Sequence, residues 1–280
     1  MKKKHSILGL CIMTGILVYI VYASQIPRVL RVSFLDVGQG DAIFIQSPTG
    51  VQVLIDGGAT KQVLEKLHNV MPLFDRSIDI VIATHPDTDH IGGLTDVVER
   101  FSIGLFIDPG ARNESGVQDI LNEKIAERNI LYRLAQRGDT YDLGGGAQLT
   151  ILFPFADVSK EESNSGSIVA RLTYGSSSFL FTGDAPAQTE YILAAIDGKN
   201  IESDVLKLGH HGSNTSSSEV FLQAVKPKWS IVSAGKKNTY GHPNEEVVER
   251  VLKFKSEILD TRTSGTIIFE TNGEMIEVLP

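Results

Sequence analysis

The segment Thr84-His85-Pro86-Asp87-Thr88-Asp89-His90 contains four side chains that can bind metal ions, all within six consecutive residues. It is here called the metal loop. The loop follows residues 77–83, an apolar run rich in β-branched residues that predicts a buried strand. Pro86 cannot continue a strand, so the imidazoles and carboxylates are expected on a loop at its carboxyl end. Such nitrogen and oxygen ligands suit zinc, manganese or iron. The segment therefore predicts a metal site rather than a polar turn whose side chains only cap the backbone.

Three further groups of candidate ligands each lie in the same kind of place, at the end of an apolar strand and beside a glycine. Asp56 and Asp184 each adjoin a glycine, and the His210-His211 pair is flanked by glycine on both sides. In layered α/β folds the ends of such strands meet at one edge, where binding sites are built. A single residue in this position would more often be structural. Because the position recurs, we expect these residues to share one site with the metal loop.

Hydrophobic periodicity predicts an α/β protein with two sheets and helices outside them. Expected strands cover residues 29–37, 42–47, 51–55, 77–83, 103–107, 147–153, 168–174, 178–182, 205–208 and 229–233, with more at the carboxyl terminus. Expected helices cover residues 60–70, 91–101, 117–128, 187–196, 220–225 and 245–254. No internal repeat or low-complexity tract interrupts this pattern. Two units follow from it, an amino-terminal segment of residues 1–28 and one domain of residues 29–280.

The amino-terminal segment has the pattern of a membrane anchor. Residues 7–23 are almost wholly apolar, follow three lysines, and are just long enough to span a bilayer. The lysines favour a cytoplasmic amino terminus, which predicts a single-pass protein of the cell membrane with its catalytic domain outside. The alternative is a signal peptide cut near Val21-Tyr22-Ala23, which would give a secreted protein. Either reading exports residues 29–280.

Charge and cysteine content restrict the chemistry. The net charge is −8, and the residues after Arg28 carry 22 lysines and arginines against 34 acids, a balance of −12. Such a surface repels polyanions in general, because nucleic-acid affinity depends largely on phosphate neutralisation. Local basic patches and bound metal ions can offset this repulsion. The only cysteine is Cys11, so no disulfide forms within the chain and the metal ligands are nitrogen and oxygen.

Four motifs together resemble the metallo-β-lactamase fold, and more narrowly the hydrolase domain of ComEC-type competence proteins. They are Leu-Asp-Val-Gly-Gln-Gly-Asp at residues 35–41, Thr-His-Pro-Asp-Thr-Asp-His-Ile-Gly-Gly at 84–93, Leu-Lys-Leu-Gly-His-His-Gly-Ser at 206–213 and Tyr-Gly-His-Pro at 240–243. The resemblance covers nearly all of residues 29–280 and implies an αββα sandwich. The chain lacks the multi-helix channel of the full competence proteins, so DNA conduction is not expected.

The resemblance implies two divalent metal ions, zinc or manganese, bridged by Asp184. One ion would be bound by His85, Asp87 and Asp184. The other would be bound by Asp89, His90, Asp184 and one of His210 or His211. Asp56 would orient the histidines from behind. The chain departs from the general family at Asp87, which replaces a histidine, and near Asn164, where a third histidine is missing; these oxygen-rich ligands favour manganese.

Two ions about 4 Å apart lower the pKa of a bound water and stabilise an oxyanion, which suits hydrolysis of a phosphodiester, ester or lactone. Asp89, His90 and His242 are the residues expected to act in catalysis. Lys207, Lys236 and Lys237 are candidates for binding the substrate anion. We expect a nucleic-acid, nucleotide or other anionic substrate and no obligate protein partner. The alternatives are a hydrolase of small esters or lactones and a non-catalytic metal-binding domain tethered to the membrane.

Overall fold

Two β-sheets pack face to face in the computed structural model, which describes residues 12–17, 29–113 and 115–280. The first sheet has eight strands, in the spatial order β15 (Ile276–Leu279), β14 (Ile267–Thr271), β1 (Leu30–Phe34), β2 (Ile43–Gln46), β3 (Gln52–Ile55), β4 (Ser77–Ile82), β5 (Ser102–Asp108) and β6 (Leu131–Leu134). The second sheet has seven, in the order β13 (Glu257–Asp260), β12 (Trp229–Val232), β11 (Val205–Lys207), β10 (Ser177–Phe181), β9 (Val169–Tyr174), β8 (Ala147–Phe153) and β7 (Thr140–Gly144).

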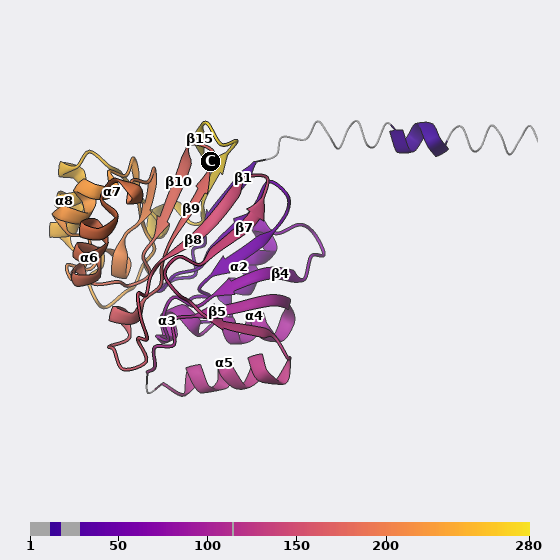
Figure 1. The fold of residues 1–280 in the computed structure, drawn as a ribbon, viewed down its shortest axis with the longest axis horizontal. Helices are drawn as coiled ribbons and strands as arrows, with labels where there is room; N and C mark the ends of the chain where they lie inside the picture. The colour runs from indigo at the N-terminus through magenta and orange to yellow at the C-terminus, as the bar shows by residue number, and fades with distance from the viewer. Residues whose placement is uncertain (1–11, 18–28, 114) are drawn as a thin grey trace, which may run out of the picture.

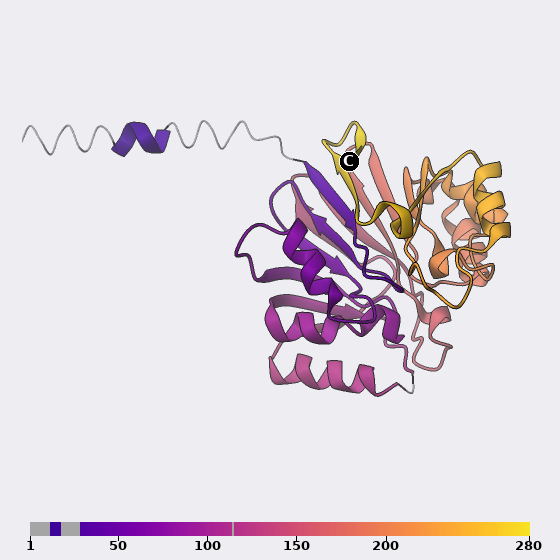
Figure 2. The same ribbon diagram turned by 180° about the vertical axis from the view of Figure 1, so that it is seen from behind.

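Helices cover the outer faces of the sheets, as Figures 1 and 2 show from opposite sides. The helices beside the first sheet are α2 (Gln62–Val70), α3 (Thr88–Ile91), α4 (Leu94–Arg100) and α5 (Gly116–Glu127). Those beside the second are α6 (Ala187–Asp197), α7 (Glu219–Val225) and α8 (Glu245–Lys253), and α9 (Thr261–Ser264) precedes β14. The described part of the chain also has three short 3₁₀ turns, η1 (Asn164–Gly166), η2 (Gly198–Ile201) and η3 (Gly209–Gly212). The arrangement confirms the predicted αββα sandwich.

Apolar side chains form three layers of core. The central layer lies between the sheets, where Phe269 packs edge-on against Phe34 and Phe179 at 5.9 Å between ring centroids. The alternation of side chains along a strand explains this: Leu30, Val32 and Phe34 of β1 all enter the central layer. Separate layers join the first sheet to α2, α4 and α5, and the second sheet to α6, α7 and α8. Three layers of core make the edge between the sheets a rigid platform.

The strands that carry the candidate ligands point the same way. In the first sheet β3, β4 and β5 are parallel, and in the second β10, β11 and β12 are parallel. Asp56 follows β3 and the metal loop follows β4, whereas Asp184 follows β10 and the His210-His211 pair follows β11. The shared edge thus receives a ligand-bearing turn from four strands, as the sequence predicted.

Some local expectations differ from the structure. The predicted helix 91–101 divides at Gly92-Gly93 into α3 and α4, and α3 already begins at Thr88 within the metal loop. Strands β6 and β7 were not expected. The side chains of β6 are all exposed and only Leu143 of β7 is buried, so neither strand has the alternation of buried and exposed residues typical of a half-buried strand.

The predicted location in the cell membrane is wrong on the structural evidence. Across residues 12–17, 29–113 and 115–280, no helix combines the length and the apolar character needed to cross a bilayer. Residues 12–17 are helical and exposed. The remainder of the apolar run 7–23 on which the prediction rested, including Cys11, lies outside the described residues.

Candidate metal centre

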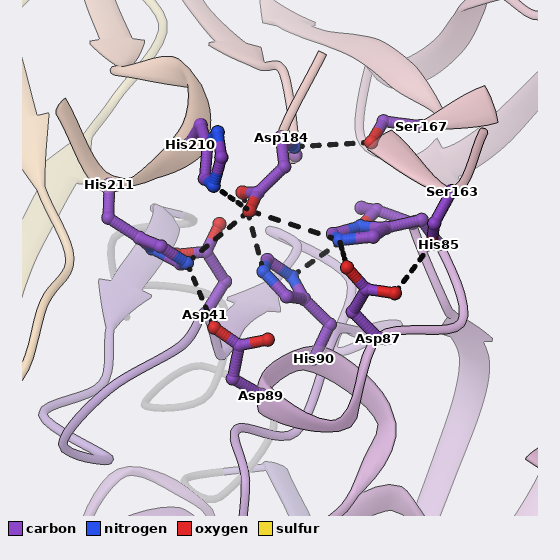
Figure 3. Close-up of polar contacts among 12 residues, drawn as sticks. Asp41, His85, Asp87, Asp89, His90, Ser163, Ser167, Asp184, His210 and His211 are labelled. Atoms are coloured by element: carbon purple, nitrogen blue, oxygen red, sulfur yellow. Dashed lines mark hydrogen bonds and ion pairs between the residues drawn. The ribbon is translucent and has the colours of Figure 1, made fainter. Parts of the chain in front are cut away.

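Asp184 lies at the centre of four imidazoles, which Figure 3 shows converging on its carboxylate. The Nε2 atom of His90 is 3.3 Å from Oδ1 of Asp184. The Nε2 atoms of His211, His210 and His85 are 3.4, 3.8 and 3.9 Å from Oδ2. The carboxylate is only 3% exposed, so these contacts lie below the protein surface. One buried carboxylate therefore joins both halves of the candidate site.

The donor atoms fit a divalent metal because they are buried and unsatisfied. Among the described residues, Nε2 of His85, His90 and His211 and Oδ1 of Asp184 make no hydrogen bond of good geometry. Buried polar atoms without partners are rare and costly unless something binds them. Two ligands held about 2.0–2.1 Å from one ion at a tetrahedral angle lie about 3.3–3.4 Å apart. The spacing of His90 and His211 from Asp184 matches that separation.

One side of Asp184 is formed by His85 and Asp87. Nε2 of His85 lies 3.7 Å from Oδ2 of Asp87. The other oxygen of Asp87 is occupied, because it accepts hydrogen bonds from Nδ2 of Asn113 at 2.9 Å and Oγ of Ser163 at 2.6 Å. Asp87 thus presents a single oxygen towards His85 and Asp184.

The other side of Asp184 is formed by Asp89, His90 and His211. Nε2 of His211 lies 3.3 Å from Oδ2 of Asp89 and is buried. His210 is 28% exposed, and its Nδ1 lies 3.0 Å from the hydroxyl of Thr215. The sequence left open which histidine of the pair is a ligand. The structure brings His211 against Asp89, whereas His210 lies at the solvent side of Asp184.

Both histidines of this pair have a backbone conformation that residues other than glycine rarely adopt. His210 and His211 both have left-handed backbones, with φ of 47° and 54°. In that conformation the two rings come within 6.1 Å of each other at 67°. Two adjacent left-handed residues that are not glycine cost free energy, which the surrounding contacts must offset. Such strain is typical of functional sites and here lets both rings reach Asp184.

Asp56 contacts His90 from behind, on the side away from Asp184. Its Oδ2 lies 2.8 Å from Nδ1 of His90. Thr84 donates to both oxygens of Asp56, through its backbone N–H and its hydroxyl, each at 2.7 Å. The hydroxyl of Thr84 is also 3.0 Å from Nδ1 of His85. Partners on Nδ1 leave Nε2 available for a metal and fix the direction of each ring.

Asp41 is a site residue that the sequence analysis did not assign. Its Oδ1 lies 3.3 Å from Nδ1 of His211, which also donates to the carbonyl of Ser233 at 2.8 Å. Asp41, His90, Asp184 and His211 each offer a ligand atom within 4.8 Å of the others. The signal was present, since Asp41 follows a glycine at the end of the first quoted motif. A Cβ on Gly40 would lie 1.8 Å from the carbonyl oxygen of Asp89, so this turn packs directly on the metal loop.

The proposed role of Lys207 in substrate binding is wrong. Its side chain is fully buried, and its Nζ lies 2.6 Å from Oδ2 of Asp41. The ammonium also donates to the carbonyl of Leu208 at 2.9 Å. A lysine without solvent access cannot meet an incoming substrate. Its charge instead stabilises the carboxylate behind His211.

The remaining predicted site residues are His242, Asn164, Lys236 and Lys237. The ring of His242 is 8% exposed and lies 5.5 Å from that of His210. Asn164 lies in η1 with its Oδ1 buried and unpartnered, and the nearby hydroxyl of Ser167 accepts the backbone N–H of Asp184 at 3.3 Å. Lys236 and Lys237 are exposed on the loop after β12.

Electrostatics favour a cation at this site. Burial alone would raise the pKa of Asp184, but the neighbouring His211 and His90 hold it well below its usual range. Burial would lower the pKa of His211, yet Asp184, Asp41 and Asp89 raise it to about 9. The pKa of His90 also rises well above its usual value against the effect of burial, because of Asp184 and Asp56. The carboxylates that keep these buried imidazoles protonated would also stabilise a divalent metal that replaces the protons.

Comparison of the sequence with known families and proteins gives matches that agree with this fold. The model described as the metallo-beta-lactamase superfamily matches residues 35–236. The chain is 32% identical over 255 residues to ComE operon protein 3 of Bacillus subtilis, covering 85% of the chain and 32% of that protein. It is 33% identical over 253 residues to recombination protein 2 of Haemophilus influenzae, covering 89% and 30%. The chain therefore spans about a third of the length of these relatives.

Structure comparison supports the same fold. Igni18, a metallo hydrolase from the archaeon Ignicoccus hospitalis, is 14% identical with a TM-score of 0.55. The match covers 87% of this chain and 99% of that one. At this identity the likeness shows the αββα arrangement alone, and the chemistry is argued from the site.

Proposed function

The chain belongs to the metallo-β-lactamase superfamily, and from that premise we propose that it is a metal-dependent phosphodiester hydrolase. The observation that carries the proposal is the convergence of buried, unsatisfied Nε2 atoms on Asp184. His85 and Asp87 on one side, and Asp89, His90 and His211 on the other, would hold two divalent ions, with Asp184 shared between them. Zinc and manganese both suit these nitrogen and oxygen donors, and the carboxylate share favours manganese.

The bound ions would supply an activated water and charge stabilisation for a hydrolytic attack. The residues of the chain orient this centre. Asp56 holds the His90 ring through Nδ1, and the Ser233 carbonyl, with the Asp41 carboxylate beside it, holds the ring of His211. Burial together with the charges on His210 and His211 lowers the pKa of His242, so its imidazole is neutral at neutral pH. A neutral imidazole beside the centre can exchange a proton with a substrate leaving group.

Phosphodiesters are favoured over other esters by the surroundings and by one relative. The exposed Lys236 and Lys237 provide positive charge on the loop that carries His242. One relative is named a recombination protein, and recombination concerns nucleic acids. The second candidate is a hydrolase of small neutral esters or lactones. The balance of −12 over residues 29–280 favours that candidate, because it repels extended polyanions.

A substrate panel with metal analysis tests the proposal. Purified protein is analysed for bound metal and then assayed with manganese or zinc on bis-(p-nitrophenyl) phosphate, single-stranded DNA and a lactone. We expect metal-dependent hydrolysis of the phosphodiesters, abolished by a chelator and restored by metal. Hydrolysis of the lactone alone would favour the second candidate. Protein that takes up no metal would contradict both.

A further inference from the structure

A row of aromatic rings leads from the protein surface to the metal centre. The ring of Tyr240 lies 5.8 Å from that of His242, with the two planes only 12° apart. The ring of His242 lies 5.5 Å from that of His210, whose Nε2 is 3.8 Å from Asp184. Tyr240 is 68% exposed, so one flat aromatic face is open to solvent within two rings of a candidate ligand.

The loop that carries Tyr240 is held in place by hydrogen bonds. Asn238 accepts the backbone N–H of His242 at 2.9 Å and donates its Nδ2 to the carbonyl of His242 at 2.9 Å. Arg262 donates to the same carbonyl at 2.9 Å. The backbone N–H of Asn244 donates to the carbonyl of Gly212, which ties the loop to η3 and its two histidines. A tyrosine on a pinned loop binds a flat partner with little further loss of conformational entropy.

We propose that Tyr240 is a stacking platform for a nucleobase whose phosphate lies at the metal centre. This rests on the proposed function and narrows the substrate to nucleotides and unpaired nucleic-acid strands. Aromatic side chains stack on bases that are free of a duplex, and every base offers a flat face. Lys236 and Lys237 lie on the same exposed loop and supply charge for an adjacent phosphate.

The acidic balance of the chain limits how much nucleic acid this subsite binds. Duplex DNA brings a dense line of phosphates and hides the faces of its bases. A surface with a balance of −12 over residues 29–280 disfavours that contact. Stacking adds affinity without further phosphate contacts. An unpaired end or a short single strand is therefore the occupant that this charge and this aromatic face both suit.

Two esters with the same leaving group test the platform. Thymidine 5′-(p-nitrophenyl phosphate) carries a base on its non-leaving arm, and methyl p-nitrophenyl phosphate carries a methyl group. For Tyr240→Leu we expect the ratio of kcat/KM between the thymidine and methyl esters to fall roughly 5- to 150-fold, mainly through KM. Tyr240→Phe keeps the ring and should keep the ratio. Tyr191→Leu removes an exposed tyrosine from α6 and serves as the matched control.

A ratio that stays within twofold in Tyr240→Leu would overturn the proposal, because Tyr240 would then only shield His242. Binding gives a readout that needs no hydrolysis. Fluorescence anisotropy compares a single-stranded oligothymidine with an abasic strand of equal length. We expect the protein to prefer the oligothymidine, and Tyr240→Leu to lose that preference. Equal binding of both strands by the unmodified protein would overturn the stacking role, even if hydrolysis fails and the proposed function with it.

Discussion

Nζ of Lys207 lies 2.6 Å from Oδ2 of Asp41, and both side chains are buried, with exposures of 0% and 1%. Burial would raise the pKa of Asp41, but the lysine and His211 lower it to about 2, so the carboxylate is ionised at neutral pH. Its other oxygen faces Nδ1 of His211 at 3.3 Å. The ion pair therefore keeps a negative charge behind a candidate metal ligand.

Replacement of Lys207 by methionine should harm folding and metal binding together. Lys207→Met leaves Asp41 charged in the core without its ammonium partner, and removal of one partner of a buried pair costs about 3–5 kcal/mol. We expect the free energy of unfolding of the metal-free protein to fall by that amount in a urea titration. Metal affinity should fall about 10- to 100-fold, as it does when a residue behind a ligand is lost.

Two further variants separate these effects. Lys226→Met breaks an exposed ion pair with Glu202 and should change neither stability nor metal affinity. The double variant Asp41→Leu with Lys207→Met removes both buried charges and should recover most of the stability. Its metal affinity should stay low, because His211 loses the Asp41 carboxylate in this variant. Wild-type affinity in the double variant would show that Asp41 does not orient His211.

The candidate site was largely visible in the sequence because its ligands repeat one local pattern. Asp56, Asp184 and His211 all follow a buried strand beside glycine, and parallel strands bring such positions to one edge. Asp41 also adjoins a glycine but does not directly follow a strand, and it stands in a motif with another acid, Asp36, so spacing does not separate the two. The structure does, since Asp41 is buried against His211.

The burial of Lys207 could not be predicted from the fact that it is a lysine. A lysine before a glycine-rich turn is usually solvated, and only the long-range contact with Asp41 explains its place in the core. The same limit applies to the fold. Strands with buried alternating residues were predicted, whereas β6 was missed because it gains its place by pairing with β5 and not by its own apolar pattern.

Asp184→Asn should abolish hydrolysis and lower metal content while the fold survives. The substitution removes the one charge that both halves of the site share, so each ion keeps fewer anionic partners. We expect metal analysis to give at most one ion per chain, activity below detection, and an unchanged circular dichroism spectrum. Asp108→Asn changes another buried acid, at the end of β5, and should retain metal and activity. Full activity with two metals in Asp184→Asn would contradict the shared-carboxylate arrangement.

Metal binding should release protons. The pKa of His211 is raised to about 9 by its carboxylates, and that of His90 is also raised, so both rings are protonated at pH 7 in the metal-free protein. A metal must displace these protons, and its affinity should therefore rise with pH until about pH 9, up to tenfold per unit for each proton displaced. Calorimetric titration in buffers of different ionisation enthalpy measures the number released. A dissociation constant that is independent of pH between 6 and 8 would contradict protonated ligands.

His242→Ala should separate catalysis from metal binding. His242 is not within the group of candidate ligands around Asp184, so its loss should leave the metal content unchanged. If it exchanges a proton in the reaction, kcat should fall about 10²- to 10⁴-fold. A histidine whose pKa is lowered by burial and by its charged neighbours is neutral above that lowered value. With metal kept saturating at every pH, wild-type activity should therefore decline as the pH falls below the ordinary histidine range, and this decline should be absent in the variant.

The exposed His68 on α2 provides the matched control for this experiment. His68→Ala removes an exposed imidazole that is not among the candidate site residues. The variant should keep both kcat and the acidic decline. Metal loss together with activity in His242→Ala would place His242 among the ligands. An unchanged kcat with the acidic decline retained would assign the proton exchange to a different group, and His210, whose ring lies next to His242, is the first to replace.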